Sequence, residues 1–365
     1  MATEIKKVLH MNEGSDETSY AKSSYIQKHV LSLTKAIKEN AIREIYCKEL
    51  PTTLCMADLG CSSAVHNTLN VMIDLINTVE KAARLAGKRG QEYQVYLNDL
   101  PGNDFNLIFR SLACFEDDLK KKVGVNYGHC FVHGVPGCFY GRLFPSNHLH
   151  FVHSSYGLHW LSQIPEGIED NENNIYIART SPPHVLKAYS DQFMKDFTSF
   201  LRCRSQEVVN GGMMIITVLG RKSLKLYSKQ ACYMWDLLAM ALNDMLLQGL
   251  IEEEKLHTFN VPQYPPSETE LRLLVEKEGS FTFNQAQVSY VNWEPMQNYN
   301  NSNKVSGHYD FFKCMRSVVE PLIKSHFGEF ILEELFLRYW KKIQVSMENE
   351  KNVFINVTLS LTRKV

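Results

Sequence analysis

The sequence predicts an α/β protein whose sheet is mostly parallel. Short apolar runs alternate with stretches of helical spacing, a pattern typical of strands joined by helical crossovers. The expected strands are residues 54–59, 93–97, 148–153 and 213–219, with helical spacing over 69–85 between the first two. A β-rich run at 352–361 follows a helical segment, and we expect it to close the sheet as a late strand, which could run antiparallel.

Charge and cysteine usage argue against several classes of protein. Lys and Arg number 39 against 40 Asp and Glu, so the chain lacks the basic surplus expected of a nucleic-acid partner. Nine cysteines contain no Cys-x-x-Cys pair, which favours reduced thiols over a disulfide framework or a zinc site. With neither a signal-like apolar N-terminus nor a membrane-length apolar run, we expect a cytoplasmic protein with no membrane partner.

The length of 365 residues suggests about two domains, or one large α/β unit with an insertion. We expect an N-terminal lid and helix at 1–50, an α/β core at 51–225, a helical cap at 226–320, and a closing helix and strand at 321–365. The cap prediction rests on Trp235–Gln248, an apolar run of helix formers that Gly249 ends as a C-cap.

The turn after the first strand bears on the ligand. Asp58 and Leu59 lead into Gly60, which permits close approach of a ligand, but the next glycine is Gly87, so the dinucleotide fingerprint is missing. A phosphate loop is missing too. A ligand with adenosine and no phosphates fits better, and S-adenosylmethionine (SAM) is the common one.

Two further turns suit an adenosine. Asp99, at the end of the second strand, can accept hydrogen bonds from both ribose hydroxyls, although a turn-forming role is the alternative. Phe139 follows a Pro-Gly turn and offers a face for adenine.

The segment His150–Gln163 is the most informative part of the chain, because it ends in a cluster of Tyr156, His159 and Trp160. Aromatic faces with hydrogen-bonding tips, delivered by the carboxyl end of a parallel strand, suit a small planar substrate. A core strand followed by an amphipathic turn is the alternative.

Four ordered motifs carry a family resemblance: ADLGCSS at 57–63, YLNDLPGNDFN at 96–106, VPGCFYGRLFP at 135–145 and HSSYGLHWLSQ at 153–163. With VLHMNEG near the start and HFGEFILEELFLRY at 326–339, the chain resembles the plant SABATH methyltransferases over essentially its whole length. The family includes salicylate, benzoate and jasmonate carboxyl methyltransferases and caffeine-pathway N-methyltransferases. The resemblance implies a Rossmann-like SAM-dependent methyltransferase fold with a helical cap, and a homodimer.

The resemblance also implies site residues. Those for the cofactor are Tyr20, Asp58, Cys61, Asn67, Asp99, Leu100, Cys138 and Phe139. Those for the substrate are Gln27, Tyr156, His159 and Trp160, with Met234, Met315 and Phe354 as apolar walls, and Tyr25 near the mouth. In carboxyl-methylating members the Gln and Trp positions hold the substrate carboxylate.

The chain departs from the family pattern in three places. The usual Ser-Gly-Pro-Asn after the first strand is replaced by Ser63–Asn67, which lacks the Gly and the Pro, and we expect a reshaped turn there. Cys138 replaces a serine, which predicts weaker cofactor binding because a thiol is the poorer hydrogen-bond partner. The positions matching a magnesium site in some relatives are Asn171, His257, Phe259 and Asn260; His257 stands where a carboxylate is usual, so we do not expect the ion to bind.

Three functions stay open at this point. A carboxylate of benzoate or salicylate is favoured, since Gln27 and Trp160 are both present and an ionised acid needs no general base. N-methylation of a xanthine alkaloid is the alternative, supported by His159 and Tyr25. A non-catalytic ligand-binding member is the third. Alignment of substrate and exclusion of water are what the first function requires of the protein.

Overall fold

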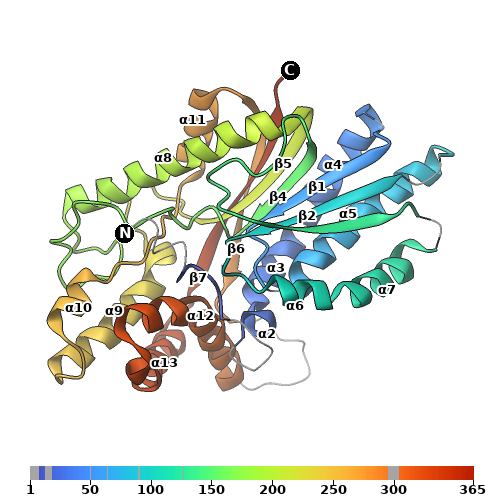
Figure 1. Ribbon diagram of the computed structural model, residues 1–365. Helices are drawn as coiled ribbons and strands as arrows, with labels where there is room; N and C mark the ends of the chain where they lie inside the picture. Colours follow the sequence, from blue (N-terminus) through green and yellow to red (C-terminus); the bar gives the residue numbers. More distant parts are fainter. Residues whose placement is uncertain are drawn as a thin grey trace.

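A seven-stranded sheet runs through the structure in the order β3-β2-β1-β4-β5-β7-β6 (Figure 1). The computed structural model describes residues 8–12, 19–49, 51–63, 65–88, 91–125, 127–294 and 304–365. The strands are β1 Thr53–Leu59, β2 Glu92–Asp99, β3 Cys130–Pro136, β4 Leu149–Ser155, β5 Val208–Gly220, β6 Phe281–Asn292 and β7 Val353–Arg363. The helices are α2 Tyr20–Ser23, α3 Tyr25–Leu33, α4 Lys35–Glu49, α5 Val65–Leu85, α6 Phe105–Arg110, α7 Leu112–Val123, α8 Pro183–Glu207, α9 Lys229–Leu247, α10 Glu253–Thr258, α11 Glu268–Glu278, α12 Lys304–Phe327 and α13 Leu332–Asn349, with a 3-10 turn at Glu329–Ile331.

The first five strands are parallel, as predicted, and β7 pairs antiparallel with both β5 and β6. All five predicted strands are present. Because the carboxyl ends of parallel strands meet at one edge, the residues that follow β1, β2 and β4 come together there.

Alternating side chains of β1 divide the core between the two faces of the sheet. Leu54 and Met56 belong to the cluster under α4, α5 and α7, whereas Cys55, Ala57 and Leu59 belong to the larger cluster that includes α8 and α9. Both faces are therefore apolar and covered, which explains why β1 reads as a continuous apolar run.

Two strands, β3 and β6, are not among those predicted from the sequence. In β6 most side chains are partly or fully exposed because the strand is an edge of the sheet, so it lacks an apolar run. In β3, the other edge, the run CFVHGVP is broken by a His, a Gly and a Pro. The segment 226–320, predicted as a helical cap, therefore holds the strand β6 as well as helices. The expected boundary at 320 falls within α12, which continues through Pro321.

Helices α9, α12 and α13 pack against one another below the sheet in the view of Figure 1. Side chains of α9 and α12, including Met234 and Met315, reach a cavity at the carboxyl edge of the strands. Both methionines come from the segment that was predicted to form a cap. Among the residues that the structure describes, no helix has the length and apolar character needed to cross a membrane.

Candidate active site

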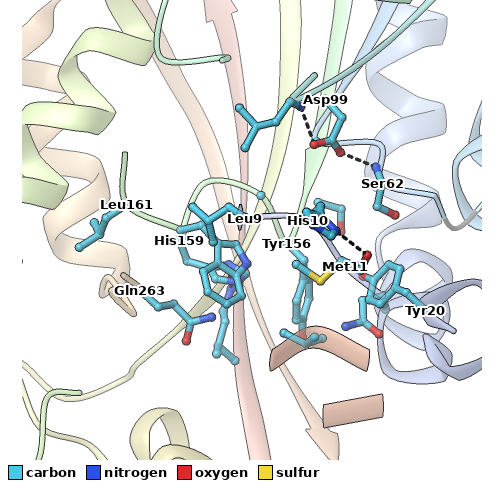
Figure 2. A pocket seen from close by; sticks show the side chains of 18 of the residues that line it. Leu9, His10, Met11, Tyr20, Ser62, Asp99, Tyr156, His159, Leu161 and Gln263 are labelled. Atoms are coloured by element: carbon cyan, nitrogen blue, oxygen red, sulfur yellow. Dashed lines mark hydrogen bonds between the residues drawn. The ribbon is translucent and has the colours of Figure 1, made fainter. Parts of the chain in front are cut away.

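A cavity of about 1150 Å³ lies at the carboxyl ends of β1, β2 and β4. A smaller hollow of about 360 Å³ adjoins it and shares Tyr20, Gln27, Gly60, Ser62 and Ser155 with it. Figure 2 shows Asp99, Ser62 and Tyr20 on one side of the larger cavity, His159, Leu161 and Gln263 on the other, and Tyr156 between them. The N-terminal residues Leu9, His10 and Met11 also line it.

Backbone hydrogen bonds tie the first two strand-end turns together. Gly60 has a φ of +80°, a conformation that favours glycine, and the N–H groups of Gly60 and Cys61 both donate to the carbonyl of Asn98 at 2.9 Å. The carboxylate of Asp99 accepts from the N–H of Ser62 and of Leu100, each at 2.7 Å. Asp99 therefore has a fixed orientation at the floor of the cavity.

Burial raises the pKa of Asp99 to about 6, although the two backbone donors act in the opposite direction. Each oxygen accepts one backbone hydrogen bond and keeps acceptor capacity for a ligand hydroxyl. This geometry suits the ribose role predicted for Asp99.

All eight residues implied for the cofactor line one hollow or both. Asp58, Cys61 and Asn67 line the smaller one, Asp99, Leu100, Cys138 and Phe139 the larger one, and Tyr20 both. Ser155 Oγ, at the boundary of the two hollows, is buried without a hydrogen-bond partner in the described part of the chain. A ligand with an adenosine end and a charged amino-acid end fits this set of groups.

The altered turn after β1 is only partly visible. Ala64 and the side chains of Val65 and His66 lie outside the described residues. Asn67 is described, and its amide donates to Ser24 Oγ at 2.9 Å. The predicted effects of this turn and of Cys138 on cofactor affinity stay predictions.

Two N–H donors on the substrate side have no hydrogen-bond acceptor among the residues that the structure describes. The Gln27 carbonyl oxygen accepts from the thiol of Cys314 at 3.7 Å, which leaves its amide N–H₂ available to the cavity. The indole N–H of Trp160 makes no hydrogen bond with any described residue. Tyr156, in contrast, is fixed: its hydroxyl donates to Asn356 Oδ1, and its backbone has a φ of +61°.

His159 is a neutral donor. The backbone N–H of Leu219 donates to His159 Nδ1 at 3.1 Å, so in the neutral ring the proton lies on Nε2. Burial lowers the pKa of His159 to about 3, so the ring is neutral at pH 7. A positioning role follows more readily than proton transfer.

Met234, Met315 and Phe354 line the larger cavity, as the resemblance implied. Two lining residues that sequence reasoning missed are Trp235 and Gln263, which are joined by a 2.9 Å hydrogen bond from the indole N–H to the amide oxygen. Trp235 was assigned only to an apolar helix, and Gln263 lies in an irregular segment without a motif. Neither carried a signal in the sequence.

Tyr25 is not among the residues that line the cavity, and its predicted place near the substrate mouth stays a prediction. Its hydroxyl donates to the carbonyl of Trp293. Tyr25 and Gln27 are two positions apart on α3, which places their side chains on opposite sides of the helix.

The residues matching a magnesium site do not fit Mg²⁺. Asn171 and Asn260 are neighbours, with Asn171 Nδ2 at 3.3 Å from Asn260 Oδ1, and Asn171 Oδ1 accepts from Ser181 Oγ at 2.7 Å. Phe259 packs against other rings, and His257 lies 3.8 Å from Glu253 on its own helix. Within the described ranges, no three His, Cys, Asp or Glu side chains gather as a metal site. Mg²⁺ prefers carboxylates and water, and the amide oxygens here are already hydrogen-bonded.

Comparisons with known proteins agree with this geometry. The family model for SAM-dependent carboxyl methyltransferases matches residues 6–364. The chain is 50% identical over 360 residues to a benzoic acid/salicylic acid carboxyl methyltransferase of Petunia hybrida, covering 99% of both chains. It is 51% identical over 365 residues to the salicylate carboxymethyltransferase of Clarkia breweri, again covering 99% of both.

Among solved structures, a loganic acid methyltransferase with S-adenosylhomocysteine (SAH) superposes with a TM-score of 0.84 at 33% identity, covering 97% of this chain and 99% of that one. These findings confirm the resemblance, the predicted fold and the cofactor.

Proposed function

The chain belongs to the family of SAM-dependent carboxyl methyltransferases, and from this premise we propose that it methylates the carboxylate of benzoate or salicylate. The observation that carries the proposal is the pair of N–H donors on Gln27 and Trp160 that have no acceptor among the described residues. Both side chains line the cavity, and a carboxylate is the acceptor-only group that two such donors recognise. The names of the Petunia and Clarkia relatives support the same acids.

The reaction makes modest demands on the protein. The bound cofactor supplies an electrophilic methyl group on a sulfonium. Gln27 and Trp160 hold one carboxylate oxygen so that the other is aimed at that group, and alignment of this kind is worth roughly 7–11 kcal/mol. An acid with a pKa near 4 is already ionised at neutral pH, so no residue has to remove a proton.

The walls of the cavity suit an aromatic ring. Met234, Met315 and Phe354 are all buried, and they offer apolar surface from α9, α12 and β7. His159 adds one polar feature, the Nε2–H. The ring hydroxyl of salicylate can accept from it, whereas benzoate has no hydroxyl on its ring, so the two acids are expected to differ in their dependence on His159.

The test is a substrate panel with radiolabelled SAM. Benzoate, salicylate, jasmonate, xanthosine, 7-methylxanthine and theobromine are each incubated with the protein. We expect a base-labile methyl ester from benzoate or salicylate. A base-resistant product from a methylxanthine would replace the proposal with N-methylation, and no product from any acid would reject it. Calorimetry with SAH identifies a protein that binds cofactor without turning over.

The homodimer and the cytoplasmic location stay predictions. Light scattering of the purified chain tests the first, and the cellular distribution of a fluorescent fusion tests the second.

A further inference from the structure

In the lining of the smaller hollow, a buried histidine holds the carboxylate that the cofactor is expected to contact. Asp58 on β1 and His153 on β4 are register partners across the parallel pair, and their side chains are 5% and 2% exposed. His153 Nδ1 lies 2.8 Å from Asp58 Oδ1. Both residues line the hollow.

The direction of this hydrogen bond follows from chemistry. An ionised carboxylate can only accept, so Nδ1 of His153 carries the proton. Burial lowers the pKa of His153, with Lys38 acting in the same direction and Asp58 in the opposite one. The ring is therefore a neutral donor, and its Nε2 is buried without a partner among the described residues. A neutral donor fixes the carboxylate and leaves its negative charge intact.

A buried cation, Lys38, acts on the charge of Asp58. Lys38 on α4 is buried, interacts electrostatically with Asp58, and donates from Nζ to the carbonyl of Leu31 at 3.1 Å. Asp99 and Cys61 are the other titratable groups that interact electrostatically with Asp58 among the described residues. Beyond the bond from His153, the Asp58 carboxylate makes no hydrogen bond within the described ranges. One oxygen is thus left for a ligand that enters the hollow.

We propose that His153 is a positioning residue for the cofactor's amino-acid end: it holds Asp58 Oδ1 and thereby keeps Oδ2 and the negative charge of Asp58 available to the α-ammonium group. Without this donor, the carboxylate is free to turn toward Lys38, and an Asp58–Lys38 pair would cancel the charge that attracts the ammonium. The inference concerns the cofactor alone and does not depend on which acid is methylated.

Two substitutions separate the donor from the bulk of the side chain. H153N retains an N–H close to the position of Nδ1, whereas H153L fills similar space and donates nothing. Two ligands separate the amino-acid end from the rest of the cofactor, because 5′-methylthioadenosine has the adenosine and sulfur of SAH but no ammonium or carboxylate.

Calorimetry at pH 7.5 on the full chain gives the Kd of both ligands for the wild type and both variants. Loss of a hydrogen bond that orients a charged group predicts that H153L weakens SAH by about fivefold or more, while H153N stays within roughly twofold of the wild type. Binding of 5′-methylthioadenosine should stay within roughly twofold in all three proteins, by the same reasoning. An unchanged SAH affinity in H153L, an equal loss for both ligands, or an H153N variant as weak as H153L would overturn the proposal.

A measurement on the wild type covers the case in which H153L does not fold. ¹⁵N NMR of histidine-labelled protein should show His153 as the neutral Nδ1–H tautomer, with its Nδ1 resonance shifted by SAH and not by 5′-methylthioadenosine. An Nε2–H tautomer, or the same response to both ligands, would contradict the assignment.

Discussion

Replacing Trp160 with phenylalanine tests the carboxylate site most directly. The indole N–H of Trp160 donates to no described residue, so W160F removes a donor that the substrate is expected to use. The ring contacts are partly retained, because Trp160 lies 6.0 Å from the ring of His159 and 6.4 Å from that of Trp235, centroid to centroid. W160F should therefore act on the acid substrate through the loss of the indole N–H.

The size of the effect follows from the type of bond. A hydrogen bond to a charged group contributes about 1.5–3 kcal/mol, which corresponds to a loss of about 13-fold to 160-fold in kcat/KM for the acid. The Kd for SAH should not change, since Tyr20 and Asp99, which are expected to bind the cofactor, lie across Tyr156 from His159, the ring neighbour of Trp160 (Figure 2).

W235F is the matched control. Trp235 also lines the cavity, but its indole N–H donates to Gln263 and not to the substrate. We expect W235F to lower thermal stability through the lost buried hydrogen bond, by about 1 kcal/mol, and to affect kcat/KM less than W160F does.

Methyl ester formation from radiolabelled SAM gives kcat/KM for each protein, and calorimetry gives the Kd for SAH. The reasoning fails if W160F retains kcat/KM within about threefold of the wild type, well short of the loss expected for a charge-assisted bond. It also fails if W235F and W160F lose equal amounts of kcat/KM. A double variant with Gln27→Leu should show non-additive losses, because both donors hold one carboxylate.

Three further predictions concern other parts of the molecule. Because the pKa of Asp99 is raised to about 6, its carboxylate gains a proton as the pH falls through that value and loses acceptor capacity for the ribose. Calorimetry should therefore show an SAH affinity that is steady above pH 7 and falls below pH 6. An affinity that does not change with pH would contradict the ribose role. R204M should lower the free energy of unfolding by about 3–5 kcal/mol in denaturant titrations, because it removes the buried cation 2.7 Å from Glu207 and the donors to the carbonyls of Phe139 and Gly141, and leaves Glu207 with the partly exposed Arg142 at 3.3 Å as its cation. A loss below about 1 kcal/mol would show that the pair is dispensable. Dialysis against a chelator should leave kcat unchanged, since Asn171 and Asn260 already satisfy their amide oxygens with protein donors, and restoration of lost activity by Mg²⁺ alone would refute this.

The strand ends and their turns could be predicted from sequence because their signals are local. Gly60 and Asp99 lie at the ends of short, largely apolar strand patterns, and parallel pairing brings such positions to one edge. The edge strands β3 and β6 could not be predicted in this way. An edge strand buries little of its surface, and β6 is identified only by its pairing with β7, which lies about 70 residues further along the chain.

Side-chain orientation in the cavity was likewise beyond local reasoning, because distant partners decide it. The thiol of Cys314 donates to the side-chain carbonyl of Gln27, and the backbone N–H of Leu219 donates to Nδ1 of His159. The indole N–H of Trp235 donates to the side-chain carbonyl of Gln263. The nearest of these partners in sequence is 28 residues away. In each case the accepting atom belongs to a side chain that lines the cavity, and that side chain keeps its own N–H for a ligand.

Because these cavity side chains all present N–H donors, they bear on the choice between an acid and a purine as substrate. A carboxylate only accepts, so it gains from the donors that Gln27 and Trp160 present, and the ring hydroxyl of salicylate can accept from His159. A xanthine nitrogen that is to be methylated must first lose or share its proton, which requires an acceptor nearby. His159 cannot serve as that acceptor, because Nδ1 is occupied by Leu219 and Nε2 carries the proton. From the sequence, His159 was compatible with either substrate. Its hydrogen bond from Leu219 now favours the acid.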